Sequence, residues 1–371
     1  MKIIQLRIES LNNIDLNIDF TPNIILCFSS LKDTQIRPYL SQLKSTFPNV
    51  KIVGCSTGGN IIDTSIHISG VTLTCIQFER SIIDIKLSQL SNENMLPIKF
   101  CNPLHSKNLK HILVFTDLQS NHFSYINEFQ NQLPENIKIS GGVAATNSYT
   151  KNNDTYVIYN GVTYKNATVF IGLYGENIKV DFGSFAGWDS FGIERIVTRS
   201  EGNILYELNG EKALPIYKNY LSTIHEEFPG AAIKFPISVR IKEDQRPIVR
   251  TVAGYCEKEQ SIEFAGDIPL YSSVKLMKAN LDRIIQGAKK SAQQCLSPQH
   301  IKPQLALLIS CMGRQAILEN DIQEEIEVVR EVFDENCTIT GFYSYGEYAP
   351  ISNTSHGVLH NQTMTITTIS E

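Results

Sequence analysis

Chemically capable side chains gather near the C-terminus, in the segment TITGFYSYGEYAPI at residues 338–351. A short β-branched run ends there in two glycines, several aromatic residues and one carboxylate, Glu347. In a strand, successive side chains point to opposite faces, so one face can join a core while the other lines a pocket. We expect a ligand pocket whose surface comes from Phe342, Tyr343, Ser344 and Tyr345.

Two opposite charges accompany these aromatic residues. Glu347 can accept hydrogen bonds from an amine, and Arg314, which follows an earlier strand, can bind a carboxylate. Together they suit a zwitterionic ligand. The alternative is structural: the tyrosines pack in a core and Glu347 pairs with Arg314.

Cys311 ends the apolar run LALLISC, three residues before Arg314 and at the expected start of a helix. A cation and a helix N-terminus both lower the pKa of a thiol, so a nucleophilic thiolate is one hypothesis. No histidine lies nearby in sequence and no Cys/His/Asn signature occurs. We therefore expect a packed thiol and no catalytic residues, with a Cys311 nucleophile as the alternative.

His360 and Asn361 stand at the start of the last strand, in HGVLHNQTMTI. His360 can face the pocket, ligate a haem iron or only cap the strand. Both residues are included among the candidate ligand-binding positions.

Two earlier glycine-containing turns offer concave, small-residue surfaces. Ser56, Thr57 and the amides at residues 58–59 can cradle a carboxylate, and Gly141 and Gly142 offer a similar surface. The alternative is that these glycines only permit tight strand packing. Neither turn is a nucleotide-binding loop, because the chain contains no GxxxxGK[ST] and no GxGxxG between a strand and a helix.

The elements that must position these residues recur three times. Each repeat begins with an apolar strand, continues through a helical segment and ends in a second strand that enters a glycine turn. The first strands are NIILCFSS (23–30), HILVFTDLQS (111–120) and LALLISCMGRQ (305–315), and the second strands are residues 50–61, 137–147 and 338–351. We predict an α/β protein with mixed β-sheets and flanking helices, built on a repeated β-α-β plus hairpin unit.

A different segment separates the second and third repeats. Its parts are predicted as a strand–turn–helix, a set of antiparallel strands and an amphipathic helix: residues 200–221, residues 233–269 with turns at 243–244 and 257–260, and residues 272–294. The Gly-rich stretch at 181–192 precedes this segment. We therefore place a domain boundary there or shortly after it, which predicts two domains, 1–199 and 200–371.

Composition narrows the classes of function. Lys+Arg 33 against Asp+Glu 38 gives a formal net charge of -5 with no basic tract, so we expect no nucleic-acid partner. No window approaches the ~18 apolar residues of a membrane span, and no signal-peptide pattern occurs, so we expect a cytoplasmic protein without membrane contact. The eight cysteines and eight histidines are dispersed without ligand spacing, and we predict no metal site.

Several of these motifs together resemble the FIST sensory proteins, which carry FIST N and FIST C domains. The resemblance rests on GCSTGGNI, SGGVAAT, LYELNGEKALPIY, LLISCMGRQ, EEI, ITGFYSYGEYAP and HNQTMTITTISE, and it spans roughly residues 20–371. Its most specific part is GFYSYGE with HNQT. It implies a FIST N-like domain at 1–199 and a FIST C-like domain at 200–371.

What the resemblance implies is a sensor of the stand-alone bacterial type that binds a small ligand, with amino acids or related metabolites suggested. Another branch of the family is described as haem-binding nitric-oxide sensors that regulate a histidine kinase, which is the alternative function. No kinase, cyclase, methyl-accepting or F-box segment is found in the sequence. We therefore expect a signal-transduction protein without catalysis, whose output lies in a partner such as a histidine kinase.

Overall fold

Three copies of one strand–helix–strand unit form the larger part of the protein. In each unit, a first strand pairs in parallel with a second strand and antiparallel with a third. The computed structural model describes residues 1–9, 18–89, 108–118, 122–147, 154–223, 226, 228, 231–243, 246–296, 302–351 and 355–371.

The strands and helices of the units fall where the apolar runs predict them. The first strands are β2 (Ile24–Ser29), β8 (Leu109–Thr116) and β22 (Leu305–Cys311), and the second strands are β3 (Lys51–Ser56), β9 (Lys138–Val143) and β23 (Thr338–Ser344). The third strands are β6 (Val71–Gln77), β12 (Ala167–Tyr174) and β26 (Met364–Ser370). The intervening helices are α1 (Asp33–Thr46), α2 (His122–Gln130), and α5 (Met312–Leu318) with α6 (Ile322–Arg330). The α/β fold with mixed sheets and a repeated β-α-β plus hairpin unit is therefore confirmed.

Each unit gives its hairpin to the sheet of another unit. Hairpin β4–β5 (Asn60–Ile62 and Ser65–His67) extends the sheet of β23, and hairpin β10–β11 (Val157–Tyr159 and Val162–Tyr164) extends the sheet of β3. Hairpin β24–β25 (Gly346–Ala349 and Val358–His360) extends the sheet of β9. Strands β1 (Lys2–Ile8), β7 (Ile82–Gln89) and β13 (Lys179–Phe185) close the opposite edges, so the described residues form three six-stranded sheets of equal order. This cyclic exchange interlocks the units.

Three phenylalanines meet where the three sheets converge. Phe28 lies 4.7 Å from Phe342 between ring centroids, and Phe115 lies 5.6 Å from Phe28 and 5.8 Å from Phe342. Each ring comes from a different unit and is fully buried. Such aromatic pairs contribute roughly 0.5–1.5 kcal/mol each beyond area burial, so this cluster fixes the sheets to one another.

The parallel strand pair of each unit contains a glycine that no other residue can replace without movement of the backbone. A Cβ atom at Gly54, Gly141 or Gly341 would lie 1.8, 1.9 or 1.9 Å from the carbonyl oxygen of the facing residue. The facing residues occupy equivalent register positions, Cys27, Val114 and Leu308. The glycines of the repeat therefore permit close strand packing.

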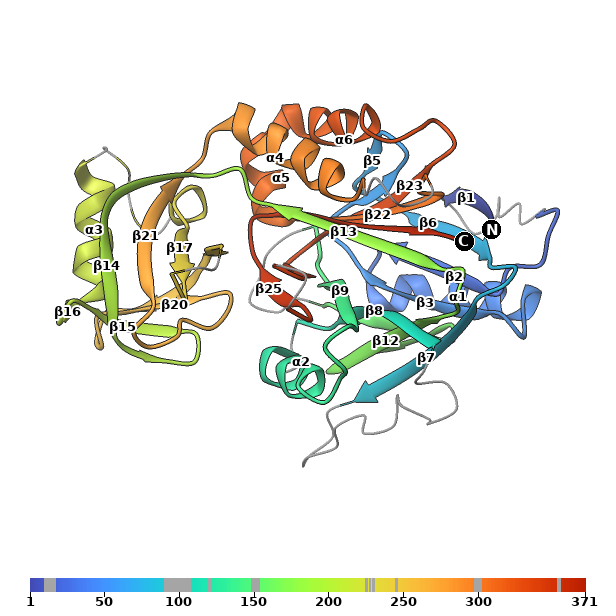
Figure 1. The fold of residues 1–371 in the computed structure, drawn as a ribbon, viewed down its shortest axis with the longest axis horizontal. Coiled ribbons are helices and arrows are strands. Elements are labelled where there is room, and N and C mark those ends of the chain that lie inside the picture. The colour runs from blue at the N-terminus through green and yellow to red at the C-terminus, as the bar shows by residue number, and fades with distance from the viewer. Residues whose placement is uncertain are drawn as a thin grey trace.

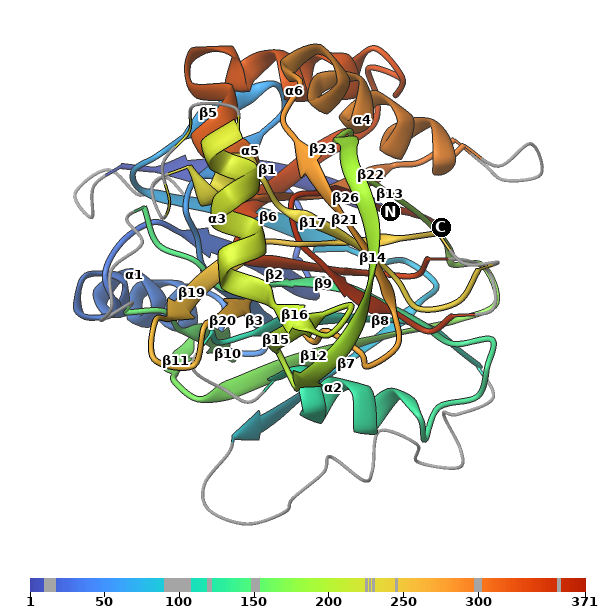
Figure 2. The same ribbon diagram turned by 90° about the vertical axis from the view of Figure 1, so that its left-hand side faces the viewer.

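A second, smaller part is inserted between β13 and the third unit. It consists of β14 (Asp189–Glu201), β15 (Ile204–Leu208), β16 (Glu211–Lys212), α3 (Ala213–Thr223), β17 (Ile237–Arg240), β18 (Ile248–Arg250), β19 (Val252–Cys256), β20 (Ser261–Phe264) and β21 (Ser273–Lys278). We call residues 189–278 the satellite and the other described residues the body. Figure 1 shows the satellite beside the body, and Figure 2 shows the three helix groups of the body on three different outer sides.

Two short connections join the satellite to the body. The first, residues 186–188, leads from β13 into β14 (Figure 1). The second, residues 279–280, leads from β21 into α4 (Leu281–Gln294). The predicted boundary at 199/200 lies within β14, so it does not coincide with either connection between the satellite and the body. The division of the chain into a FIST N-like and a FIST C-like domain at that position remains a prediction.

Within the satellite, the turn of the predicted strand–turn–helix at 200–221 is present at Asn209–Gly210, and the predicted helix at 272–294 is partly wrong. Residues 273–278 form β21, because Val274 and Leu276 alternate into the satellite's hydrophobic core. The helix starts only after Asn280, whose side chain accepts a hydrogen bond from the Arg283 amide as an N-cap. Among the described residues, no helix is both long and apolar enough to cross a membrane.

We expect Gly54→Ala and Gly341→Ala each to lower the free energy of unfolding by about 3 kcal/mol or more, because the added methyl overlaps a backbone carbonyl. Urea denaturation followed by circular dichroism measures the change. Gly210→Ala is the matched control, since no atom lies within 4 Å of its Cβ position. Its positive φ alone predicts a loss of about 1–2 kcal/mol. Equal losses in all three variants would contradict the packing argument.

Candidate functional site

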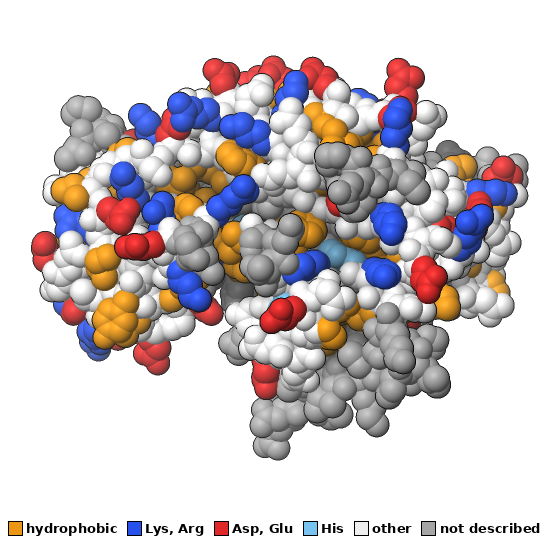
Figure 3. Space-filling view, viewed as in Figure 1, with side chains coloured by type: hydrophobic (Ala, Val, Ile, Leu, Met, Phe, Trp, Pro, Cys, Tyr) orange, Lys and Arg blue, Asp and Glu red, His pale blue; other side chains and the backbone are white. Residues whose placement is uncertain are grey.

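A cavity of about 330 Å³ lies at the junction of the satellite and the body. Its apolar wall on the body side and in the first connection is formed by Phe182, Phe185, Ala186, Trp188, Pro350 and Ile351. The satellite contributes Pro247, Val249 and Met277. On the face shown in Figure 3, hydrophobic side chains and Lys or Arg side chains lie together where the two parts meet. The volume of the junction cavity and its largely apolar lining are typical of a small-molecule site.

A few polar side chains line the same cavity. They are Ser184, Ser238, Arg246, Gln294, His360 and Thr363. Arg246 is exposed, whereas burial lowers the pKa of His360 to about 4, so its imidazole is neutral at pH 7. No Asp or Glu occurs among the described lining residues. The charge of the lining is therefore positive and comes from Arg246.

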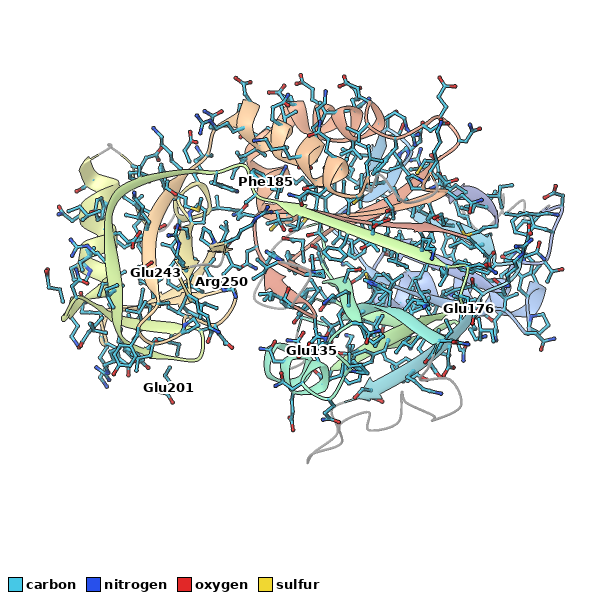
Figure 4. All side chains as sticks on the ribbon, in the orientation of Figure 1. Glu135, Glu176, Phe185, Glu201, Glu243 and Arg250 are labelled. Carbon is cyan, nitrogen blue, oxygen red and sulfur yellow. The ribbon has the colours of Figure 1, made fainter. Side chains whose placement is uncertain are left out.

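The short segment 359–363 of the body holds the satellite in place. Arg250 donates to the carbonyl of Leu359 at 2.9 Å, and the amide of Thr251 donates to Asn361 Oδ1 at 3.4 Å. Trp188 Nε1 donates to the carbonyl of Gln362 at 3.1 Å. Figure 4 shows Arg250 between the two parts. Because His360 and Thr363 of this segment line the cavity, the cavity wall and the docking contacts share one backbone segment.

Arg314 forms a buried ion pair that fixes both connections. Its Nε lies 2.5 Å from Glu325 Oε1, and both side chains are fully buried. Its Nη1 donates to the carbonyl of Ala186 at 2.6 Å, and its Nη2 donates to the carbonyl of Ile284 at 2.7 Å. Ala186 belongs to the first connection and Ile284 follows the second. The structure therefore places Arg314 as a clamp on the satellite's attachment, and its pairing with Glu347 is wrong.

The partner of Arg314 is itself fully hydrogen-bonded. Glu325 Oε2 accepts from Ser310 Oγ and from the hydroxyl of Tyr343, each at 2.9 Å. Tyr343 is fully buried, so its hydroxyl serves this network and the residue does not line the cavity. A buried ion pair with its remaining lone pairs satisfied is the arrangement that offsets the cost of desolvation.

Glu347 lies directly behind the cavity wall. Its Oε2 accepts from the amide of Thr363 at 3.2 Å and from the Thr363 hydroxyl at 2.9 Å. Burial raises the pKa of Glu347 to about 8, although its hydrogen bonds with Ser344 and Thr363 partly oppose this rise. Glu347 is therefore largely protonated at pH 7 and acts as a neutral hydrogen-bonding group.

The geometry around Ser344 agrees with a protonated Glu347. Ser344 Oγ lies 2.7 Å from Glu347 Oε1 and 3.3 Å from the carbonyl oxygen of Ser310. A serine hydroxyl has one proton, so both contacts are complete when Glu347 donates to Ser344 and Ser344 donates to Ser310. This chain of bonds supports Thr363, which faces the cavity.

Cys311 has the properties of a packed thiol. Burial and the nearby Glu347 raise its pKa, which outweighs the opposing effects of Arg314 and of nearby backbone amides. The side chain is 5% exposed. Reactive cysteines are partly exposed and have lowered pKa values, so these properties disfavour the hypothesis of a Cys311 nucleophile.

The remaining predicted positions serve the body of the protein. Ser56 Oγ accepts from the amide of Tyr156, and Thr57 Oγ1 donates to Asn60 Oδ1 at 2.6 Å. Gly142 packs against Ile309 and Phe342, as Gly141 does against Val114. The structure does not bring these residues to the junction cavity, and it places Tyr345 beside Thr146 through its hydroxyl.

Among the predicted ligand-binding residues, His360 alone lines the junction cavity in the described part of the chain. Asn361 adjoins it through the docking contact with Thr251. Sequence reasoning missed Trp188, Arg246, Val249 and Met277. One signal is present in the sequence: the single tryptophan of the chain lies in the Gly-rich stretch 181–192, whose glycines predict only a domain boundary.

Haem does not fit the described residues of this cavity. The Nε2 of His360, the histidine in the lining, lies 3.1 Å from the carbonyl oxygen of Ala349, to which it donates. A volume of about 330 Å³ is also at the small end of ligand pockets. Among the described residues, no group of three or more His, Cys, Asp or Glu is placed to hold a metal ion. We derive no role for an iron or haem group.

Comparison with known proteins gives two consecutive family matches. Residues 23–211 match the FIST N domain, and residues 213–350 match the FIST C domain. The chain is also 24% identical over 394 aligned positions to "Uncharacterized protein MJ1623" of Methanocaldococcus jannaschii. That alignment covers 92% of this chain and 72% of the relative.

We expect Glu347→Gln to remove a pH dependence of stability. The folded pKa of about 8 exceeds the ordinary 4.5, so the folded state holds a proton that the unfolded state releases. The stabilising effect is complete below about pH 4.5 and is lost as pH rises toward 8, by up to roughly 4 kcal/mol. Urea unfolding of both proteins at pH 5, 6, 7 and 8 measures the difference. Parallel curves would show that Glu347 does not titrate in this range.

We expect Arg314→Met to lower the free energy of unfolding by about 3–5 kcal/mol, because Glu325 is left buried without its cation. The double variant Arg314→Met/Glu325→Gln should recover part of this loss. Chemical denaturation measures all three proteins. Arg283→Met is the matched control, since Arg283 pairs with Asp189 at the same connections but is exposed, which predicts a loss below about 1 kcal/mol. A loss for Arg314→Met no larger than the control's would refute the clamp.

Proposed function

The chain belongs to the FIST family, and on this premise we propose that it senses a small molecule bound in the junction cavity and relays its presence without catalysis. FIST domains are associated with sensory signal transduction and small-ligand binding. The observation that carries the proposal is that segment 359–363 has two roles. His360 and Thr363 line the cavity, and the same segment accepts hydrogen bonds from Arg250 and Thr251 of the satellite.

The shared segment offers a physical route from binding to signal. A ligand in the cavity would touch Met277 and Ser238 of the satellite together with Thr363 of the body. Its contacts would exist only while the two parts are docked, so binding stabilises the docked arrangement over any other. Connections of three and two residues are the type of element that absorbs a hinge motion.

The proposed ligand is a metabolite of about the size of an amino acid, which suits a cavity of about 330 Å³. A change in the satellite's position would be read by a partner protein, for which the family suggests a histidine kinase. We also propose a cytoplasmic location, on the basis of the family to which the chain belongs. The haem-dependent alternative has no supporting observation in the lining, and the packed Cys311 offers no nucleophile.

Trp188 provides a direct test. It is the single tryptophan of the chain and lines the cavity, so a bound ligand should change its fluorescence. We expect a panel of amino acids and common metabolites to contain a compound that shifts this emission saturably and raises Tm. A ligand at about 100 times its Kd adds roughly 2.7 kcal/mol to the free energy of unfolding.

The matched control is Ala186→Phe, which fills the cavity from the first connection and leaves the carbonyl of Ala186 free to bind Arg314. Both the fluorescence change and the Tm shift should disappear in this variant. A hit that persists there would place the ligand elsewhere, and a complete absence of hits would contradict the sensor proposal.

A further inference from the structure

The charge in the described lining of the junction cavity is positive. Arg246 of the satellite lines the cavity, and among the described residues it makes no hydrogen bond or ion pair. On the body side, Lys290 Nζ lies 4.9 Å from the ring centroid of Phe185, whose side chain is part of the wall. Arg246 is therefore the cation in the described lining, and Lys290 is a second cation that contacts the wall through the Phe185 ring.

No described lining residue balances these cations. The lining contains no Asp or Glu, and the carboxyl group of Glu347 lies behind Thr363, to which it is already hydrogen-bonded. Of the buried cations nearby, Arg314 is neutralised by Glu325, and Arg250 donates to backbone carbonyls and is not in the lining. A ligand with a carboxylate would complement Arg246, whereas an ammonium group would be desolvated beside the positive charge of Arg246 with no carboxylate in the described lining to receive it.

The rest of the lining is apolar and suits a hydrocarbon body. Trp188, Met277 and Val249 are buried, with 8%, 7% and 4% of their surfaces exposed. Their side chains offer aromatic and aliphatic surface on both sides of the junction. Apolar ligand surface placed there leaves water without loss of a hydrogen bond, which is favourable.

We infer that the ligand of the junction cavity is a monocarboxylate with an apolar body, held through Arg246, rather than a zwitterionic amino acid. This inference rests on the proposed function and narrows it. It replaces the expectation of a zwitterion between Arg314 and Glu347, because neither of those side chains presents a free charge to the cavity.

Three probes that share a phenylethyl body test the charge requirement. They are 3-phenylpropanoate, phenylalanine and 2-phenylethylamine, which carry a negative charge, both charges and a positive charge. Titration calorimetry and Trp188 fluorescence give the Kd of each. We expect the acid to bind most tightly, with phenylalanine and the amine weaker by about tenfold or more.

The variant Arg246→Ala should weaken binding of the acid by about tenfold or more, because a charge-assisted hydrogen bond is lost. Arg240→Ala is the matched control: Arg240 is exposed on β17 of the same satellite, outside the lining, and its loss changes net charge equally. Binding to this control should equal that of the unmodified protein. Both positions are exposed, so neither variant is expected to impair folding.

The outcomes separate the ligand class from the site. Phenylalanine binding as tightly as the acid, or an Arg246→Ala variant no weaker than Arg240→Ala, overturns the monocarboxylate inference. If Ala186→Phe still abolishes that binding, the cavity remains the ligand site. If no probe binds but a metabolite other than a monocarboxylate does so in an Ala186→Phe-sensitive manner, the inference falls and the proposed function stands. If no metabolite binds at all, both fall.

Discussion

The buried pair of Arg314 and Glu325 is the interaction on which the arrangement of the two parts depends. Removing two charges from water costs several kcal/mol per ion, and only good geometry with additional hydrogen bonds offsets that cost. Here Glu325 also accepts from Ser310 and Tyr343, and Arg314 also donates to the carbonyls of Ala186 and Ile284. The pair thereby joins the third unit to both connections of the satellite. Without it, the two connections would lose the side chain that joins them to the third unit.

The architecture of the three-unit body explains why the cavity lies at the junction with the satellite and not at the centre of the body. The sheets have the same strand order, and their hairpins are exchanged around the ring, so the centre is filled by Phe28, Phe115 and Phe342. A centre packed in this way leaves no room for a ligand. The chain departs from the repeat after β13, where the satellite is inserted. A cavity forms there because two separately packed parts meet along an incompletely filled junction.

Polar groups behind the cavity wall connect the site to the body. Glu347, Ser344 and Thr363 form one hydrogen-bonded chain between β22 and the cavity. The neutral carboxyl group of Glu347 satisfies the buried donors of Thr363 without adding a charge near the cavity. Arg250 has the complementary role from the satellite: it is 4% exposed and uses backbone carbonyls of Val249, Asp267 and Leu359 as acceptors. Both groups orient backbone that the ligand would touch.

The sequence by itself determined the elements of the body and the family. Apolar runs bounded by glycine turns predicted the strand pairs of all three units, because side-chain periodicity and glycine placement are local properties. The sequence predicts a helix where strand β21 lies, since SVKLMKAN is compatible with either period. Strand pairing buries Val274 and Leu276 in the satellite's core and decides between the two. Only the tertiary structure decided that Arg314 pairs with Glu325, that the hairpins change sheets, and that Trp188, Arg246 and Thr363 share a cavity. Those contacts join residues far apart in the chain, and which of several compatible partners meet is set by the packing of the whole molecule, which no local pattern records.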